Sequence, residues 1–153
     1  MSRFLIGVGN ETMTDDGVGP RVADAAAERA RALGFETVLI GHDTVSLLAY
    51  LDAPTRRVLL VDCVRMGLAP GDWLVFSPDA VETRKPLARM TTHEGDVLRI
   101  VEMARQLGGR LPQVTILGIE PADVAPGLEL SPALAGRLDE YVEAAIAEMR
   151  RSA

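Results

Sequence analysis

Short apolar segments alternate with longer helical segments along almost the whole chain of 153 residues. The apolar runs are residues 3–9, 36–42, 56–64, 72–77 and 113–120. Apolar residues recur at helical spacing in residues 17–33, 44–53, 91–109 and 131–151. This alternation is typical of a parallel sheet, because each parallel connection must cross over the sheet through a helix. We therefore predict one α/β domain over residues 1–153, a three-layer sandwich with a mostly parallel five-stranded sheet and helices on both faces.

Turn and cap residues refine this prediction. Residues 72–77 follow the third apolar run after a Pro-Gly turn, which favours an antiparallel hairpin with residues 56–64. Gly34 fits the end of the first long helix, and Thr91 or Thr92 fits the start of the third helical segment. Ser131 and Pro132 fit the N-cap and first position of a single last helix. Met103 and Met149 are expected in the core.

Composition excludes several classes of protein. The net charge of −6 and the isoelectric point near 4.9 argue against nucleic-acid binding, which needs clustered Lys and Arg. Cys63 is the only cysteine, so an intramolecular disulfide and a cysteine-based zinc site are both impossible, and we expect a small buried side chain there. We find no signal peptide or membrane-spanning segment, and a cytoplasmic location is expected.

Several polar residues follow the predicted strands, where ligands bind in doubly wound folds. Asp16 follows the first strand after a turn, Asp62 lies near the end of the third, and His93 opens the third helical segment. A doubly wound sheet would bring these distant residues to one edge. Two carboxylates and an imidazole are a plausible metal ligand set that leaves coordination positions open.

Each of these residues also has a structural interpretation. Asp15 or Asp16 could cap the first helix, and Asp43 could cap the next short helix. Asp62 could bind loop amides, and His93 could be a surface residue. The sequence assigns no role to His42, which closes the second strand.

The glycine-rich turn "GVGNETMTDDG" does not match a nucleotide site. It contains neither G-x-G-x-x-G nor G-K-[ST], and its adjacent acids would repel a diphosphate. A nucleotide-binding regulator is therefore a less favoured alternative.

The same turn, extended to "GVGNETMTDDGVGPRVAD", resembles the opening signature of the [NiFe] hydrogenase maturation endopeptidases. Further segments match that family in the right order. "VLLVDCVRMGLAPGDW" resembles its strand-end aspartate and following hairpin, and "TTHEGDVLRIVEMARQLG" resembles its Thr/Ser–His helix start. "VTILGIEPADVAPGLELSPAL" resembles its G-I-E-P segment and the approach to its last helix. The similarity extends over nearly the whole chain.

The resemblance implies an endopeptidase that removes a C-terminal extension from a hydrogenase large-subunit precursor after nickel insertion. It also implies that Asp16, Asp62 and His93 form the metal-sensing and catalytic site. The nickel would be carried by the substrate, so no tightly bound resident metal is expected. The expected partner is the precursor large subunit, without nucleic acid or membrane, and the protein is expected to be a monomer.

Two mechanisms fit these expectations. The nickel could polarise the scissile carbonyl or a water molecule, or it could only dock the substrate while a carboxylate acts as general base, as in an aspartyl-type enzyme. We favour docking with metal-assisted hydrolysis. Neither H-E-x-x-H nor G-x-S-x-G is present, which disfavours a resident catalytic zinc and a serine hydrolase.

Other classes of protein remain open at this point. A nickel-binding chaperone or regulator would bind free nickel tightly and cleave nothing. A peptidyl-tRNA-hydrolase-like enzyme shares a similar fold and a G-x-G-N turn, but this chain has no histidine before His42, and its acidity disfavours tRNA.

Overall fold

The computed structural model describes residues 2–41, 43–52, 54–79, 92–108 and 110–151, with the side chains of residues 92–96 outside that description. The elements in chain order are β1 (Ser2–Val8), 3-10 helix η1 (Thr14–Gly17), α1 (Val18–Ala32), β2 (Glu36–Ile40), 3-10 helix η2 (Thr44–Tyr50), β3 (Thr55–Cys63), β4 (Trp73–Phe76), α3 (Thr92–Gln106), β5 (Gln113–Ile119), α4 (Pro132–Ala135) and α5 (Leu138–Arg150). No helix in these ranges has the length and hydropathy needed to cross a bilayer.

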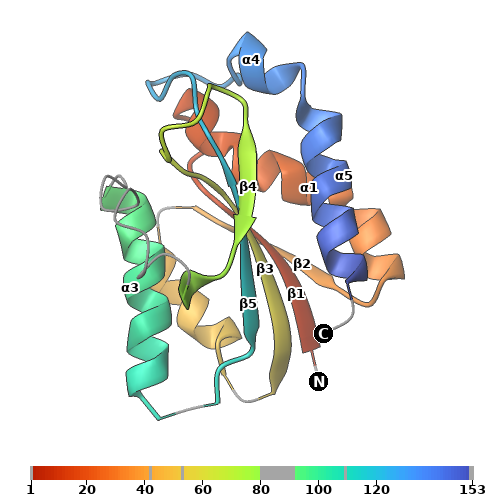
Figure 1. Cartoon of the computed structure of the whole chain (residues 1–153), viewed down its shortest axis with the longest axis vertical. Coiled ribbons are helices and arrows are strands. Elements are labelled where there is room, and N and C mark those ends of the chain that lie inside the picture. Colours follow the sequence, from red (N-terminus) through yellow and green to blue (C-terminus); the bar gives the residue numbers. More distant parts are fainter. Residues whose placement is uncertain (1, 42, 53, 80–91, 109, 152–153) are drawn as a thin grey trace.

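The strands form one five-stranded sheet in the order β2-β1-β3-β5-β4. The first four strands in that order run parallel, and β4 runs antiparallel to β5. Helices α1 and α5 cover one face of the sheet, whereas α3 and η2 cover the other (Figure 1). The predicted three-layer α/β sandwich is therefore confirmed.

Strand β3 lies at the centre of the sheet, which explains the apolar run of residues 58–61 in its middle. Leu59, Val61 and Cys63 pack in the core under α1 and α5. Val58 and Leu60 pack in the core on the opposite face. Both faces of a central parallel strand are covered by helices, so both sets of alternate side chains are buried. Cys63 is only 2% exposed, as expected for a small core residue.

The predicted hairpin between β3 and β4 is wrong. β4 does run antiparallel, but its partner is β5, with Trp73 opposite Ile119 and Phe76 opposite Ile116. β1 and β5 pair with β3 on its two sides, so no free edge of β3 remains for β4. The chain after β3 therefore passes to the outer side of β5.

The last helical segment is two helices rather than the single helix expected from the sequence. Ser131 and Pro132 do occupy the N-cap and first position of α4, but the Ser131 side chain makes no capping hydrogen bond. Gly136 and Arg137 separate α4 from α5. The guanidinium of Arg137 forms an ion pair with Asp72, 2.9 Å from its Oδ1, which holds this junction against the loop before β4.

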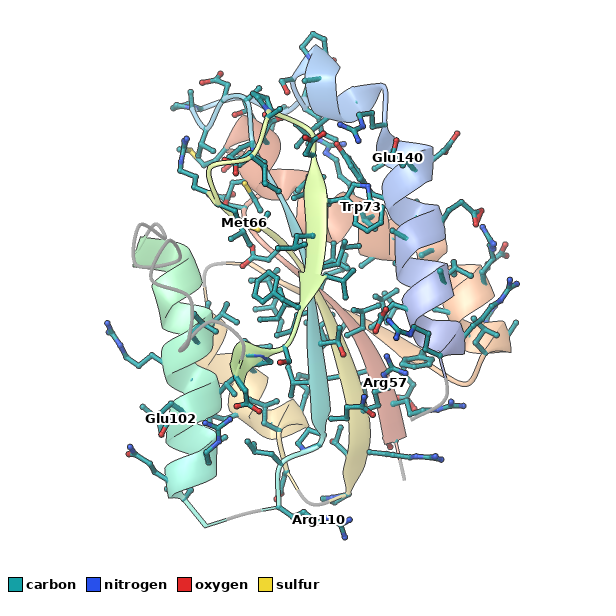
Figure 2. The ribbon with its side chains drawn as sticks, in the orientation of Figure 1. Arg57, Met66, Trp73, Glu102, Arg110 and Glu140 are labelled. Atoms are coloured by element: carbon teal, nitrogen blue, oxygen red, sulfur yellow. The ribbon has the colours of Figure 1, made fainter. Side chains whose placement is uncertain are left out.

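Helix α5 is tied to the same loop and to β4. The hydroxyl of Tyr141 donates a hydrogen bond to the Gly71 carbonyl oxygen at 2.6 Å, and its side chain is fully buried. Figure 2 shows Trp73 beside Glu140, and the indole Nε1 donates to the Glu140 carboxylate at 2.7 Å. Burial raises the pKa of Tyr141 to about 12.

Local predictions had mixed outcomes. Gly34 follows α1 with φ +84°, a conformation that favours glycine at a helix end. Residues 44–50 form the 3-10 helix η2 within the segment predicted as a short helix. Met149 is buried as expected, but Met103 is 43% exposed, so its assignment to the core was wrong. The predicted cap at Thr91 lies outside the described residues.

Candidate functional site

The candidate site lies where α1 begins, at the carboxyl ends of β1 and β3. A Cβ atom at Gly19 would collide with the backbone carbonyl oxygens of Val8 and Val61, so the start of α1 lies directly against both strand ends. A Cβ atom at Gly7 would lie 2.6 Å from the Gly19 carbonyl oxygen. These glycines therefore allow the helix and the strands to pack closely together. Their role is in packing, in agreement with the lack of a dinucleotide-binding motif in the sequence.

The first of the paired acids, Asp15, joins this turn to a distant loop. Its carboxylate is completely buried and accepts hydrogen bonds from the backbone N–H groups of Ala122 and Asp123 at 2.9 and 3.0 Å. It also accepts from the backbone N–H and the hydroxyl of Ser131 at 2.7 and 2.8 Å. The negative charge of Asp15 thus organises the chain between β5 and α4.

The preceding residue strengthens the same connection. Thr14 has a left-handed backbone with φ +45°. Its hydroxyl donates to the carbonyl oxygen of Asp123 at 2.8 Å and accepts from the N–H of Ala125 at 3.0 Å. Its backbone N–H donates to the Gly127 carbonyl oxygen at 2.9 Å. The strained conformation of Thr14 is held by contacts from a segment more than 100 residues away in sequence.

The second acid, Asp16, has different surroundings. Its side chain is partly exposed, and its Oδ2 atom accepts a hydrogen bond from the backbone N–H of Asn10 at 2.9 Å. The Asn10 side chain in turn accepts from the N–H of Thr12 at 3.0 Å. The interpretation of these acids as helix caps is wrong, since neither η1 nor α1 has a side-chain cap hydrogen bond.

Asp62 lies one residue before the end of β3 and is 2% exposed. Its Oδ1 atom is shielded from solvent. The 3-10 helix η1, which contains Asp16, contacts β3. The fold therefore brings the elements of both predicted acids to the same edge of the sheet.

His93 lies in the first turn of α3, and its side chain is outside the described residues. Among the side chains that are described, no three His, Cys, Asp or Glu groups are placed to hold one metal ion. The joint site of Asp16, Asp62 and His93 therefore stays a prediction. His42 also lies outside the described residues. Asp43 does occupy the N-cap position of η2, as the sequence suggested, but its side chain makes no cap hydrogen bond.

Glu120 is a buried acid whose function the sequence analysis missed. It follows β5, is 6% exposed, and its Oε1 accepts from the backbone N–H groups of Met66 and Leu68 at 2.6 and 3.0 Å. It thereby fixes the loop that follows Asp62 and Cys63. The available signal was an acid between a buried apolar strand and a proline, in the G-I-E-P segment.

A pocket of about 270 Å³ lies beside the turn that contains Asp16. It is lined by Gly9, Asn10, Glu11, Thr12, Pro20, Leu39, Ile40 and Gly41. We call it the first-turn pocket. Its wall includes Asn10, which holds the Asp16 carboxylate, so the pocket and the predicted ligand share one turn.

Comparison with known proteins identifies the family. The family model of the HycI hydrogenase maturation proteases matches residues 21–148. The chain belongs to the hydrogenase maturation protease family. As a maturation protease it is a hydrolase that acts on peptide bonds, which favours the endopeptidase interpretation over the nickel chaperone, the nucleotide-binding regulator and the peptidyl-tRNA hydrolase.

Individual relatives agree with the assignment of this chain to the family. The chain is 32% identical over 123 residues to the hydrogenase 3 maturation protease of Escherichia coli K12, covering 79% of this chain and 74% of the relative. It is 27% identical over 150 residues to the hydrogenase expression/formation protein HupD of Rhodobacter capsulatus, covering 96% and 70%.

Solved structures support the fold of the maturation protease. The maturating endopeptidase HybD of E. coli superposes with a TM-score of 0.79 at 20% identity, covering 98% of this chain and 93% of that one. The HybD protease of Thermococcus kodakarensis gives 0.75 at 23% identity, covering 98% and 100%. At these identities the likeness concerns the fold alone.

Proposed function

We propose that this protease removes a C-terminal extension from the large-subunit precursor of a [NiFe] hydrogenase once nickel has been inserted. Family membership supports a hydrogenase precursor as substrate, because the relatives are named for hydrogenase maturation. The observation that most supports the choice of site is the contact of η1, which contains Asp16, with β3, which contains Asp62.

In this proposal the metal arrives with the substrate. Asp16, Asp62 and His93 would contribute two carboxylate ligands and one imidazole to a nickel ion already held by the precursor. Carboxylate oxygen and imidazole nitrogen both bind nickel. Three ligands alone leave coordination positions for the substrate's own groups, so affinity for free metal would be low.

Hydrolysis then needs an activated water molecule and a polarised carbonyl group. Water oxygen attacks the scissile carbonyl carbon, the C–N bond breaks, and the proton lost by water passes to the leaving amine. The docked nickel would polarise the carbonyl or the water. A carboxylate that is not engaged with the metal could instead take the proton as general base. We favour the metal-assisted route.

The decisive experiment compares precursors with and without nickel. Purified protease is mixed with nickel-loaded and nickel-free large subunit, and mass spectrometry follows the mass of each precursor. We expect loss of a C-terminal peptide from the loaded precursor only. An intact loaded precursor would contradict the proposed substrate, and equal cleavage of both forms would contradict the role of nickel as signal.

A further inference from the structure

Strand β2 forms an edge of the sheet, and in the described part of the chain no further strand covers it. It is the end strand in the sheet order, and β1 is the one described strand that pairs with it. The carbonyl oxygen of Ile40 accepts a hydrogen bond from the N–H of Gly9, so the peptide groups of Ile40 face β1. Peptide groups alternate in direction along a strand, so those of Thr37 and Leu39 face away from the sheet.

The side chains of these two residues point to the α1 side of β2. Ile40 and Val38 belong to the core on the opposite face, under α3 and η2, so Thr37 and Leu39 face the other way. Leu39 is 50% exposed, although it is a large apolar residue in a strand. The open edge and an apolar side chain therefore coincide.

Hollows flank this edge at both ends of the strand. The first-turn pocket is bounded by the last residues of β2, Leu39 and Ile40, and by Gly41. A second pocket of about 340 Å³ is lined by Phe35, Glu36 and Thr37 together with residues of α1. In the described part of the chain, hollows therefore lie beside both ends of β2.

The edge leads to the candidate site. Asn10 lines the first-turn pocket, and its N–H holds the carboxylate of Asp16. A peptide segment that followed β2 over its five residues would extend about 16 Å, at roughly 3.3 Å per residue, and end at this turn. A protease needs its substrate extended at the scissile bond; a strand edge supplies main-chain hydrogen bonds for this, and an adjoining pocket selects a side chain.

We propose that the precursor segment next to the scissile bond binds as an added strand on the outer edge of β2, with an apolar side chain in the first-turn pocket. The inference rests on the proposed function and names how that substrate is held. The N–H and C=O groups of Thr37 and Leu39 pair with the segment. Pro20, Leu39 and Ile40 provide the apolar wall of the pocket.

The composition of β2 is compatible with the binding of an added strand. Exposed edges are commonly protected by Pro, Lys or inward-pointing charges, because they otherwise pair with other chains. The sequence of β2, ETVLI, contains neither Pro nor Lys, and its one charged residue is Glu36 at the first position. The four residues after Glu36 carry no charge that would repel an added strand.

A proline at position 37 tests the proposal from the side of the protease. Thr37→Pro removes an N–H that faces away from the sheet and blocks a neighbouring strand, while the hydrogen bonds with β1 are kept. Thr37→Val keeps the N–H and serves as the matched control. We expect cleavage of the nickel-loaded precursor to fall at least about tenfold for Thr37→Pro relative to Thr37→Val. Thermal unfolding verifies that both variants are folded.

A second measurement does not depend on the folding of a variant. Precursors are assembled by ligating a synthetic C-terminal segment with one N-methylated residue at successive positions around the scissile bond. Strand addition predicts slow cleavage at alternate positions only, because every second N–H faces the protease. Cleavage that is insensitive to methylation, or equal rates for folded Thr37→Pro and Thr37→Val, would overturn the inference. Failure of the wild-type protease on the unmodified loaded precursor would instead contradict the proposed function.

Discussion

Two neighbouring aspartates in one turn have different functions because their surroundings differ. Asp15 is completely buried and accepts hydrogen bonds from three backbone N–H groups and one hydroxyl. Asp16 is partly exposed and is oriented by the N–H of Asn10. A buried carboxylate with this many donors is a structural anchor, whereas a half-exposed one can still bind a cation.

The anchoring role of Asp15 can be tested by a nearly isosteric change. Asp15→Asn replaces one acceptor oxygen by an NH₂ group that must face N–H donors. We expect the free energy of unfolding to fall by about 2–4 kcal/mol, since hydrogen bonds to a charged group are lost inside the protein. Urea denaturation measures this. Asp24→Asn, at an exposed position of α1, is the control, and an equally small effect of both changes would contradict the anchor.

Substitution of the predicted metal ligands should have the opposite effect to Asp15→Asn, because the protein should stay folded but lose its activity. Asp16→Asn, Asp62→Asn and His93→Ala should each reduce cleavage of the nickel-loaded precursor at least about a hundredfold, because loss of a partner that merely supports a metal ligand already costs about 10–100-fold. Mass spectrometry gives the rates and circular dichroism confirms folding. Asp24→Asn should cleave normally. Normal processing by all three variants would exclude this ligand set.

At the scale of elements, local patterns predicted the parallel core well and its periphery less well. The apolar residues 58–61 in the middle of β3 were assigned to a strand, and they are apolar throughout because both faces of that strand are covered. The partner of β4 was missed because a turn after β3 favours a hairpin, whereas β5 occupies that edge of β3 and itself pairs with β4. The break between α4 and α5 was missed because the ion pair of Arg137 with Asp72 joins residues 65 apart.

The contact between α5 and the loop before β4 makes the free energy of unfolding decrease at alkaline pH. Burial raises the pKa of Tyr141 from 10.0 to about 12. A group whose pKa is higher in the folded state stabilises the fold fully below its unfolded pKa and loses that contribution as the pH rises through the folded value. The contribution of Tyr141 should therefore be constant below about pH 10 and disappear by about pH 12.

The comparison of wild type with Tyr141→Phe isolates this contribution. Near neutral pH the variant should be less stable by about 1 kcal/mol, because the hydrogen bond to the Gly71 carbonyl oxygen is lost. Chemical denaturation at a series of pH values should show the wild-type advantage shrinking between pH 10 and 12. A wild-type advantage that stays constant over that interval would contradict a raised pKa of Tyr141 in the folded state.

At the scale of the whole molecule, the sequence predicted that the elements of Asp16 and Asp62 share one edge of the sheet, but not the contacts that hold the turns at that edge. Asp16 and Asp62 were selected because polar residues at the ends of parallel strands share one edge. The partners of Asp15 and Glu120 lie 107–116 and 52–54 residues away in sequence, so no local pattern contains them. They become visible only when the turns at this edge are folded against one another.

The proposed site as a whole should bind free nickel weakly, because tight binding would remove the difference between loaded and empty precursor. Three protein ligands without the substrate's own groups should give a dissociation constant above about 1 μM. This corresponds to a binding free energy weaker than about −8 kcal/mol. At a tenfold excess of nickel over this constant, the free energy of unfolding should rise by only about 1.4 kcal/mol. Titration calorimetry and thermal unfolding measure the two quantities. The double variant Asp16→Asn/Asp62→Asn shows which heat belongs to this site. Nanomolar binding that the double variant abolishes would favour a nickel carrier over a sensor of nickel in its substrate.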